Sequence, residues 1–485
     1  MTDKTIREDP RDVPVFDETD VLVAGGGVAG CAAAVAAARA GAQTILVERN
    51  GCLGGVATAT MMANIGNRYM LSNGAQTIHG IAAEVADRLV DAGAASPTWR
   101  RCKSIPMDSE RLKVILIEML DEAGVKLLTH SMAALPILEN KAVKGCYFGS
   151  KSGRQAILAE NTVDCTGEAD LAYRAGAEVK EHRASSSLLF KLANVDVDRF
   201  VDFLGEDPEG FPDGMDWVKN YEEFAARWRE HNSLLFPHHG GRNWRWLQDE
   251  MAEAGYGEVR EGGRRWWGDV ENIEAFGMYT HRRDGTIVIN TGYLCFDRIE
   301  VGEFSRFEML AQRFCYYAAD FMIAHIPGFE NARVEHIGVD LGMRGGRYIV
   351  GRSRLKMGEL KGSTRNVYRD DVIATAPCQP TDGTQEPGAL GTTCDIPFGS
   401  CVPAGLSRIL VGSGKSVDAE GGNSRIYRGM SGCMVYGQAT GAAAALAAGR
   451  GIGAENLPMC DLQAELLRQG VRLGDEQRLK ELGLR

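Results

Sequence analysis

The sequence predicts an α/β fold, in which a parallel sheet between helices is interrupted by an inserted α+β domain. An apolar strand over 20–24 leads directly into Gly25-Gly26-Gly27-Val28-Ala29-Gly30, and an Ala-rich helix follows. A second apolar strand over 44–47 ends on an acidic residue, Glu48. The composition changes between about 183 and 290, where six of the seven tryptophans lie. The last third returns to regular α/β patterning, so we expect the sheet to be built from both ends of the chain.

The order strand, Gly-x-Gly-x-x-Gly, helix, strand and acid is that of the βαβ unit that binds dinucleotides, so the first domain is predicted to be Rossmann-like. Gly25 would form the tight turn after the strand, and Gly27 would let a pyrophosphate approach the helix N-terminus. Gly30 would let the helix pack closely on the strand, and Glu48 would accept hydrogen bonds from a ribose. A glycine-rich turn in an ordinary α/β protein is the alternative.

Composition narrows the class of protein. A length of 485 residues suggests two or three domains. The net charge of −11 argues against a nucleic-acid surface as the main function. The chain has no run of about twenty apolar residues, and its first residues lack the apolar core of a signal peptide. Its twelve cysteines form no Cys-x-x-Cys pair. We therefore expect a reduced, cytoplasmic enzyme with no metal site and no membrane or nucleic-acid partner.

Further elements follow in order along the chain. Residues 1–18 are polar and acidic and are predicted to form a leader. Two apolar runs, 134–138 and 143–148, flank a turn and predict a β-hairpin. A strand over 162–167 ends on a tight turn at Thr166-Gly167. The other predicted helices and strands cover 109–123, 125–130, 156–159, 286–290, 304–326, 334–337 and 408–412, with an Ala-rich helix ending at 448.

The tryptophan-rich region is predicted to be an inserted substrate or cap domain with an aromatic-rich surface. Prolines, glycines and histidines lie between the tryptophans. A satellite hydrophobic core under long loops is the alternative interpretation. The six tryptophans are Trp217, Trp228, Trp244, Trp246, Trp266 and Trp267.

Three further segments favour FAD over a nicotinamide cofactor, because a large extended cofactor needs contacts from distant parts of the chain. After Glu48 and Arg49, the pair Gly54-Gly55 allows a second backbone approach, and Thr58 could donate to a phosphate. The turn at Thr166-Gly167 returns a strand to the same crevice. A strand then ends at Gly412, and a helix is predicted to start near Ser431, where its N–H groups would point at the flavin N1/C2 edge.

On these residues the sequence resembles the FAD-dependent oxidoreductase family, whose fold is similar to that of glutathione reductase. The family is related to fumarate reductase and thiazole-biosynthesis flavoproteins. The matching segments are 25–30, 48–58, 164–172, 396–412 and 428–441. The resemblance implies backbone contacts from Met132 to the adenine, and places residues 428–434, with Arg428, Ser431 and Cys433, against the isoalloxazine. From the change in composition and the return of α/β patterning we expect three parts: residues 1–182 begin the FAD-binding domain, 183–330 form the cap, and 331–485 complete the FAD-binding domain.

Two departures from the family pattern concern charged residues. The segment 342–351 keeps Arg344 and Arg347 but lacks the acid that the family places between them. Lys415 stands in an altered turn after Gly412. It could stabilise reduced flavin or an anionic substrate, or it could be a solvated surface lysine.

A flavin dehydrogenase needs a base for one proton and groups that orient the substrate. His79 and His281 are the candidate bases, and Arg347, or Arg344, could clamp a substrate carboxylate. Buried structural histidines and ion-paired arginines are the alternatives. Cys52 has no cysteine partner at a suitable spacing, which argues against a disulfide-reductase mechanism.

The predicted function is an FAD-dependent oxidoreductase that transfers a hydride between a small organic substrate and flavin N5. The aromatic cap mildly favours a cyclic substrate. Three alternatives stay open: a flavoprotein subunit of a larger electron-transfer complex, a tRNA-modifying flavoprotein and an enzyme that uses a nicotinamide cofactor alone. The sequence also leaves open a homo-oligomer or a partner electron-transfer protein.

Overall fold

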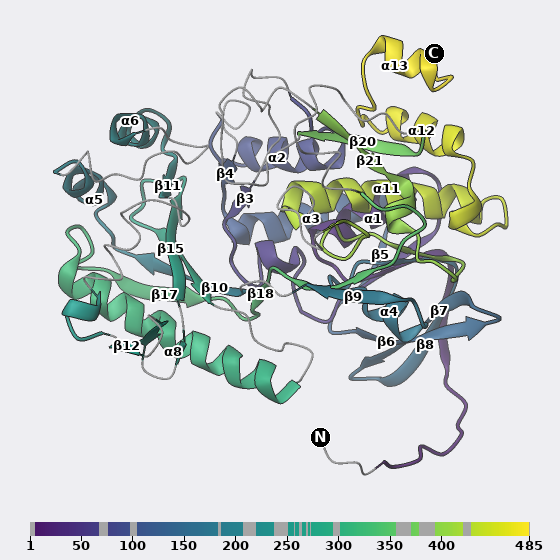
Figure 1. Ribbon diagram of the computed structural model, residues 1–485, viewed down its shortest axis with the longest axis horizontal. Coiled ribbons are helices and arrows are strands. Elements are labelled where there is room, and N and C mark those ends of the chain that lie inside the picture. The colour runs from purple at the N-terminus through teal and green to yellow at the C-terminus, as the bar shows by residue number, and fades with distance from the viewer. Residues whose placement is uncertain are drawn as a thin grey trace.

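The computed structural model describes residues 5–66, 76–97, 104–182, 186–206, 220–236, 251–256, 258–260, 264–267, 270–271, 273–293, 301–355, 370–377, 393–420 and 428–484. These residues form two lobes (Figure 1). The main lobe comprises the described residues up to 182 and from 346 onward. The cap comprises those from 186 to 345.

The main lobe is built on a parallel sheet whose strand order is β5-β2-β1-β8, with β22 beside β8. The long strand β8 pairs with β22 along its last residues and, along its first, with an antiparallel hairpin of β6 and β7. The strands are β1 (Val15–Ala24), β2 (Thr44–Val47), β5 (Lys126–Leu128), β6 (Met132–Glu139), β7 (Ala142–Ser150), β8 (Gly153–Asp164) and β22 (Ile409–Val411). The predicted hairpin is confirmed. The predicted leader is wrong in part, because β1 already begins at Val15.

Helices α1 (Val28–Arg39) and α11 (Met430–Ala448) lie side by side over this sheet, although some 400 residues separate them in the chain (Figure 1). Small residues bring their backbones together. A Cβ atom on Gly437 would lie 2.0 Å from the carbonyl oxygen of Ala29, and one on Gly441 would lie 2.0 Å from that of Ala33. Helix α11 is buried along almost its whole length. The C-terminal segment is therefore part of the core of the N-terminal domain.

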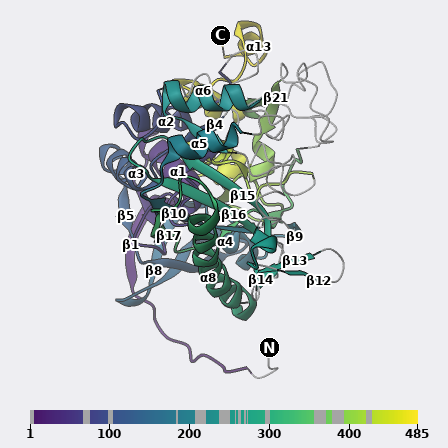
Figure 2. The same ribbon diagram turned by 90° about the vertical axis from the view of Figure 1, so that its left-hand side faces the viewer.

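The cap is built on an antiparallel sheet with the order β11-β15-β16-β10-β17, and β18 also pairs with β10. Helix α8 (Val301–His325) covers its outer face; in Figure 2 it lies in front of the cap strands, on the side away from the main lobe. Two short helices, α5 (Val197–Leu204) and α6 (Tyr221–His231), complete the cap core. The strands are β10 (Ser186–Ala193), β11 (Leu234–Phe236), β15 (Ile273–Thr280), β16 (Ile287–Tyr293), β17 (Arg333–Ile337) and β18 (Gly342–Met343).

Trp228 is the one tryptophan of the aromatic-rich region whose side chain the structure describes. It is 1% exposed in the cap core, and its indole N–H donates to Asp198 Oδ1 at 2.7 Å. For this residue the prediction of an aromatic surface is wrong and the hydrophobic-core alternative holds. Trp217, Trp244 and Trp246 lie outside the described residues, and of Trp266 and Trp267 the structure describes only the backbone, in β13 (Arg264–Trp267).

The chain passes between the two lobes on two adjacent strands. Strand β9 (Val179–His182) leads into the cap, and β19 (Gly346–Ile349) returns from it; the two pair with each other in antiparallel fashion. The remaining elements are α2 (Ile81–Asp91), α3 (Ser109–Ala123), α4 (Asp170–Arg174), α12 (Met459–Arg468), α13 (Glu476–Glu481), β3 (Asn64–Gly66), β4 (Ser104–Pro106), β12 (Glu258–Arg260), β14 (Val270–Glu271), β20 (Val372–Pro377) and β21 (Thr393–Pro397).

Candidate active site

The carboxyl ends of β1, β2, β8 and β22 meet at one edge of the main sheet, where they open into a cavity of about 820 Å³. Such an edge is where open α/β sheets bind ligands. The loops after these strands line the cavity, and so does the start of α11 at Gly429 and Met430. The cap closes the opposite side through residues of β10, β15, β18 and α8.

The three glycines after β1 have different surroundings. Gly25 has a φ of +99°, and a Cβ atom there would lie 2.5 Å from the carbonyl oxygen of Cys165. A Cβ atom on Gly30 would lie 1.7 Å from the carbonyl oxygen of Gly25. Gly27, in contrast, has an ordinary φ of −64°, and a Cβ atom there would meet nothing within 4 Å. Gly25 and Gly30 are needed for the turn itself, whereas Gly27 faces the cavity.

Glu48 organises the loop around this turn. Its buried carboxylate accepts hydrogen bonds from the backbone N–H groups of Gly26, at 2.6 Å, and Asn50, at 2.7 Å. Gly54, with a φ of +102°, donates its N–H to the carbonyl oxygen of Gly26 at 2.8 Å. Glu48, Gly54 and Gly55 all line the cavity beside Gly27.

Thr58 does not have the predicted position. Its hydroxyl donates to the carbonyl oxygen of Leu53, and the side chain is 1% exposed. Within the described chain it is not part of the cavity wall. Because the hydroxyl has a single proton, the prediction that it donates to a phosphate is corrected: Thr58 fastens the loop that carries Gly54 and Gly55.

Asp164, at the end of β8, fixes the second turn. Its carboxylate accepts hydrogen bonds from the N–H and hydroxyl of Thr166, at 3.0 and 2.7 Å, and from the N–H of Ala172, at 2.9 Å. Burial raises the pKa of Asp164, and these three hydrogen bonds oppose the rise. Thr166 and Gly167, which has a φ of +93°, thereby face the cavity.

The C-terminal residues that were predicted to contact the cofactor separate into two groups. Arg428 and Cys433, at the start of α11, line the cavity. Gly412 and Ser431 are not among the described lining residues. A Cβ atom on Gly412 would lie 2.7 Å from Cys165 Sγ and 2.8 Å from Thr440 Oγ1, so Gly412 serves close packing. Ser431 is fully buried within the first turn of α11.

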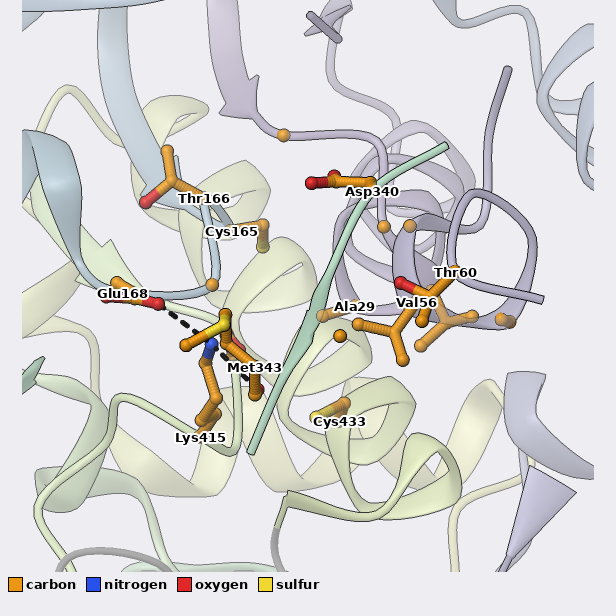
Figure 3. Close-up of a pocket in the computed structure, with 18 of the residues that line it drawn as sticks. Ala29, Val56, Thr60, Cys165, Thr166, Glu168, Asp340, Met343, Lys415 and Cys433 are labelled. Atoms are coloured by element: carbon orange, nitrogen blue, oxygen red, sulfur yellow. Dashed lines mark hydrogen bonds and ion pairs between the residues drawn. The ribbon is translucent and has the colours of Figure 1, made fainter. Parts of the chain in front are cut away.

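Charged residues at the cavity are mostly paired. Lys415 Nζ lies 3.3 Å from Glu168 Oε1 and donates to the carbonyl oxygen of Met343, on β18, at 3.2 Å (Figure 3). Arg49 pairs with Asp340 and thereby links the main lobe to the cap. Lys415 is thus a mostly buried link between the lobes, and the alternative of a solvated surface lysine is wrong.

Arg347, a candidate for clamping a substrate carboxylate, also lines the cavity. Its guanidinium pairs with Asp170 and lies over the ring of Tyr173, 4.4 Å from the centroid. Its Nε atom is buried and has no hydrogen-bond partner in the described part of the chain. The pair with Asp170 holds Arg347 on the side of the main lobe, next to the Thr166 turn.

Comparison with known proteins identifies the family to which the chain belongs. The family model described as FAD dependent oxidoreductase matches residues 20–466, which is nearly the whole chain. The chain belongs to this family. It is an FAD-dependent oxidoreductase, and its cofactor is FAD.

Two curated relatives and one solved structure are similar to this FAD-dependent oxidoreductase. The digeranylgeranylglycerophospholipid reductase of Methanoculleus marisnigri is 28% identical over 41% of this chain and 52% of its own length. Digeranylgeranylglycerophospholipid reductase 2 of Methanothermobacter thermautotrophicus is 28% identical over 37% of this chain and 48% of its own. The chain therefore spans about half the length of the curated relatives it matches. A geranylgeranyl bacteriochlorophyll reductase-like protein from Thermoplasma acidophilum aligns over 96% of this chain and 84% of its own, with 13% identity and a TM-score of 0.42.

The residues at the cavity fit FAD. The open space beside Gly27 at the N-terminus of α1 suits a pyrophosphate, because the backbone N–H groups and the helix dipole there favour an anion. The start of α11 presents a second positive helix end to the same cavity. In the described part of this FAD-dependent oxidoreductase, no helix is long and apolar enough to cross a bilayer.

The two predicted catalytic histidines are not brought to the cavity; neither belongs to its described lining. His79 lies in the turn before α2, with Nε2 3.1 Å from the carbonyl oxygen of Gln76, and burial lowers its pKa. His281 is partly buried near Asp108, which precedes α3, and desolvation lowers the pKa of His281 to about 4. Both positions correct the prediction of a histidine base, and both fit structural histidines.

Glu308, on α8 beneath the link between Arg49 and Asp340, makes the stability of the cap depend on pH. Burial and the charge of Asp340 raise the pKa of Glu308 to about 7, against the opposing effects of the Leu341 N–H and Arg49. The folded protein therefore binds a proton that the unfolded chain has released, so stability falls as the pH rises from about 4.5 to about 7. Because Glu308 is only partly buried, we expect a loss of about 1 kcal/mol.

The substitution Glu308→Gln keeps the shape of the side chain and removes its titration. We expect the variant to unfold at the same temperature as the parent at pH 5 and at a higher temperature at pH 8, measured by circular dichroism. Asp320→Asn, at an exposed position of the same helix, is the control and should follow the parent at both pH values. Parallel curves for parent and Glu308→Gln would contradict the assignment.

Proposed function

We propose that this FAD-dependent oxidoreductase transfers a hydride between flavin N5 and a small organic substrate held between the main lobe and the cap. One observation carries the proposal: a single cavity reaches from Gly27 and Glu48, at the sheet edge, to Ser187 and Tyr279, on the cap. A cavity that served cofactor binding alone would not need a wall from a second lobe. Its volume of about 820 Å³ lies in the upper part of the range typical of ligand sites.

The residues on the cavity wall suggest how the cofactor lies. Glu48, Arg49 and Met132 line the end that would hold the adenosine, with Gly27 beside the pyrophosphate. Arg428, Gly429 and Cys433 line the end that would hold the isoalloxazine. The strand order β5-β2-β1-β8-β22, together with the antiparallel hairpin, supports a glutathione-reductase type of FAD-binding domain.

When bound, FAD supplies a centre that exchanges two electrons and a proton with the substrate. The chain supplies the surroundings. The start of α11 directs its positive helix end at the ring, which favours the negative charge of the reduced state. The cap forms one wall of the cavity, and Arg347, fixed by Asp170 and Tyr173, is our candidate among the predicted residues for orienting a bound group. The curated relatives are named as reductases, which supports reduction of a substrate as one direction.

The proposal is tested by purifying the protein and recording its visible spectrum. We expect a yellow protein with flavin bands, which is bleached under anaerobic illumination with a photoreductant. A screen of small organic compounds should then find one that bleaches the bound flavin, or reoxidises it, without oxygen. A colourless preparation that takes up no FAD would overturn the proposal. Because His79 lies away from the cavity, His79→Ala should keep the substrate response, whereas Arg347→Ala should weaken it at least tenfold.

A further inference from the structure

The cap sheet has two faces with different chemistry. On β10, the side chains of Leu188, Phe190 and Leu192 join the core under α8. The residues between them point the other way, toward the main lobe, because neighbouring side chains on a strand alternate. Ser187 and Leu189 are the first of these, and Ser187 lines the cavity. We call the side toward the main lobe the inner face.

Ser187 is a buried polar residue whose hydroxyl has no hydrogen-bond partner among the described residues. It is 1% exposed, and its Oγ atom makes no hydrogen bond to any described residue. Its register neighbours on the two adjacent strands are Gly292 and Gly342, neither of which has a side chain. Buried hydroxyls are normally hydrogen-bonded, and leaving one unsatisfied costs free energy. A group from a ligand in the cavity would satisfy it.

Tyr279, on β15, brings a second hydroxyl to the same wall. It is 1% exposed and lines the cavity, and its hydroxyl accepts a hydrogen bond from Asn290 Nδ2 at 2.9 Å. Burial raises the pKa of Tyr279 to about 12, although the bond from Asn290 and the charge of Arg344 lower it. The phenol therefore keeps its proton at neutral pH and brings a neutral hydroxyl to the cavity wall.

Arg344 provides the positive charge at this end of the cavity. It directly follows β18, whose Met343 carbonyl is held by Lys415, and it lines the cavity. Arg344 follows by two residues Gly342, the register neighbour of Ser187, and its positive charge lowers the pKa of Tyr279. Two hydroxyls and a guanidinium on one wall are a set that binds an oxyanion.

The residues around Ser187, Tyr279 and Arg344 are mostly apolar. Leu189, Leu235 and Val288, on the inner face, form a cluster with Met61 and Ala63 of the main lobe, and Tyr279 belongs to it. Met62 packs against this cluster and lines the cavity. A ligand that reaches Ser187 and Tyr279 therefore also contacts methionine and aromatic carbon. Such a wall favours an anionic group attached to an apolar carbon skeleton over a highly hydrated small anion.

We propose that Ser187, Tyr279 and Arg344 form a carboxylate-binding subsite on the inner face of the cap, and that the substrate is a carboxylate with an apolar carbon skeleton. The proposal rests on the proposed function, because it names the substrate class of the same cavity. It assigns the carboxylate to Arg344 on the cap and leaves Arg347 on the opposite side, next to the Thr166 turn.

The test compares two probes of the same shape and different charge, benzoate and benzamide. Each is titrated into the FAD-loaded protein, and binding is followed by the flavin absorbance spectrum and by calorimetry. We expect benzoate to bind at least about tenfold more tightly than benzamide, because charge-assisted hydrogen bonds are stronger than neutral ones. In Arg344→Met the two probes should bind within about twofold of each other, and Ser187→Ala should weaken benzoate at least about threefold.

The control is Arg333→Met, which removes an exposed arginine on β17 of the same sheet and should keep the preference for benzoate. Equal binding of the two probes by the parent, or a preference that survives in Arg344→Met, would overturn the subsite. If Arg344→Met fails to hold FAD, the parent comparison and Ser187→Ala still decide. A protein that holds reducible flavin but does not discriminate the probes refutes the subsite alone, whereas a protein without flavin refutes the proposed function.

Discussion

Replacing Gly27 by valine is expected to give a folded protein that no longer binds FAD. The backbone at Gly27 has a φ of −64°, which any residue can adopt, and a Cβ atom there meets no protein atom within 4 Å. The fold therefore tolerates the side chain. The added methyl groups would occupy the space at the N-terminus of α1 where we place the pyrophosphate, and would keep an anion away from the backbone N–H groups.

We expect the affinity for FAD to fall at least a hundredfold, which corresponds to about 3 kcal/mol. Flavin fluorescence titration of the apoprotein measures the affinity, and circular dichroism measures the thermal midpoint of the apoprotein, which should change little. Gly449→Val is the matched control. Gly449 is exposed at the C-terminal end of α11 with a φ of −60°, a Cβ atom there would have its nearest neighbour at 3.8 Å, and the residue is not among the described residues that line the cavity. Retained FAD binding in Gly27→Val would refute the assignment of this surface to the cofactor.

Replacing Gly441 by leucine is expected to have the largest effect on stability. A Cβ atom at Gly441 would lie 2.0 Å from the carbonyl oxygen of Ala33, and a backbone atom cannot move aside as a side chain can. The substitution would force α11 away from α1 and open the core of the main lobe. Overpacking of a core typically costs about 1–3 kcal/mol, and we expect at least the upper value here.

Urea unfolding of the apoprotein measures this loss, with Gly441→Ala as a milder second variant that should lie between parent and Gly441→Leu. Gly449→Ala is the control on the same helix. Gly449 has a φ of −60°, and a Cβ atom there would have its nearest neighbour at 3.8 Å, so the alanine should be neutral or slightly stabilising. An unchanged midpoint for Gly441→Leu would show that the two helices pack differently.

Local signals made the N-terminal unit predictable from the sequence. Helix α3 begins and ends where the sequence predicts, because Asp108 caps its first N–H groups and Gly124 takes a left-handed conformation at its end. The start of β1 was not predictable in this way. Residues such as Asp17 and Glu18 read as polar leader, and only their pairing with Ile157 and Leu158 of β8 makes them strand.

The cofactor end of the site could be predicted better than the substrate end. Gly25, Gly27 and Glu48 carry a spacing that fixes their roles in one supersecondary unit. Ser187 and Tyr279 carry no such spacing, and the alternation of a strand does not say which of its faces meets the other lobe. The positions of His79 and His281 were also not predictable, because residue type alone does not show where a side chain lies in the fold. Their chemistry suits a base, but the tertiary fold places both away from the cavity.

The contact between α1 and α11 has a consequence for how the chain is made. Residues 15–164 form strands β1 and β8 early in synthesis, but β22 and α11, which complete the sheet edge and its cover, leave the ribosome some 250 residues later. Until then the late part of β8 has an unpaired edge, and the alanine surface of α1 is uncovered. The nascent chain must stay soluble with that edge open while the whole cap is synthesised, so the complete FAD site forms only after α11 has packed on α1.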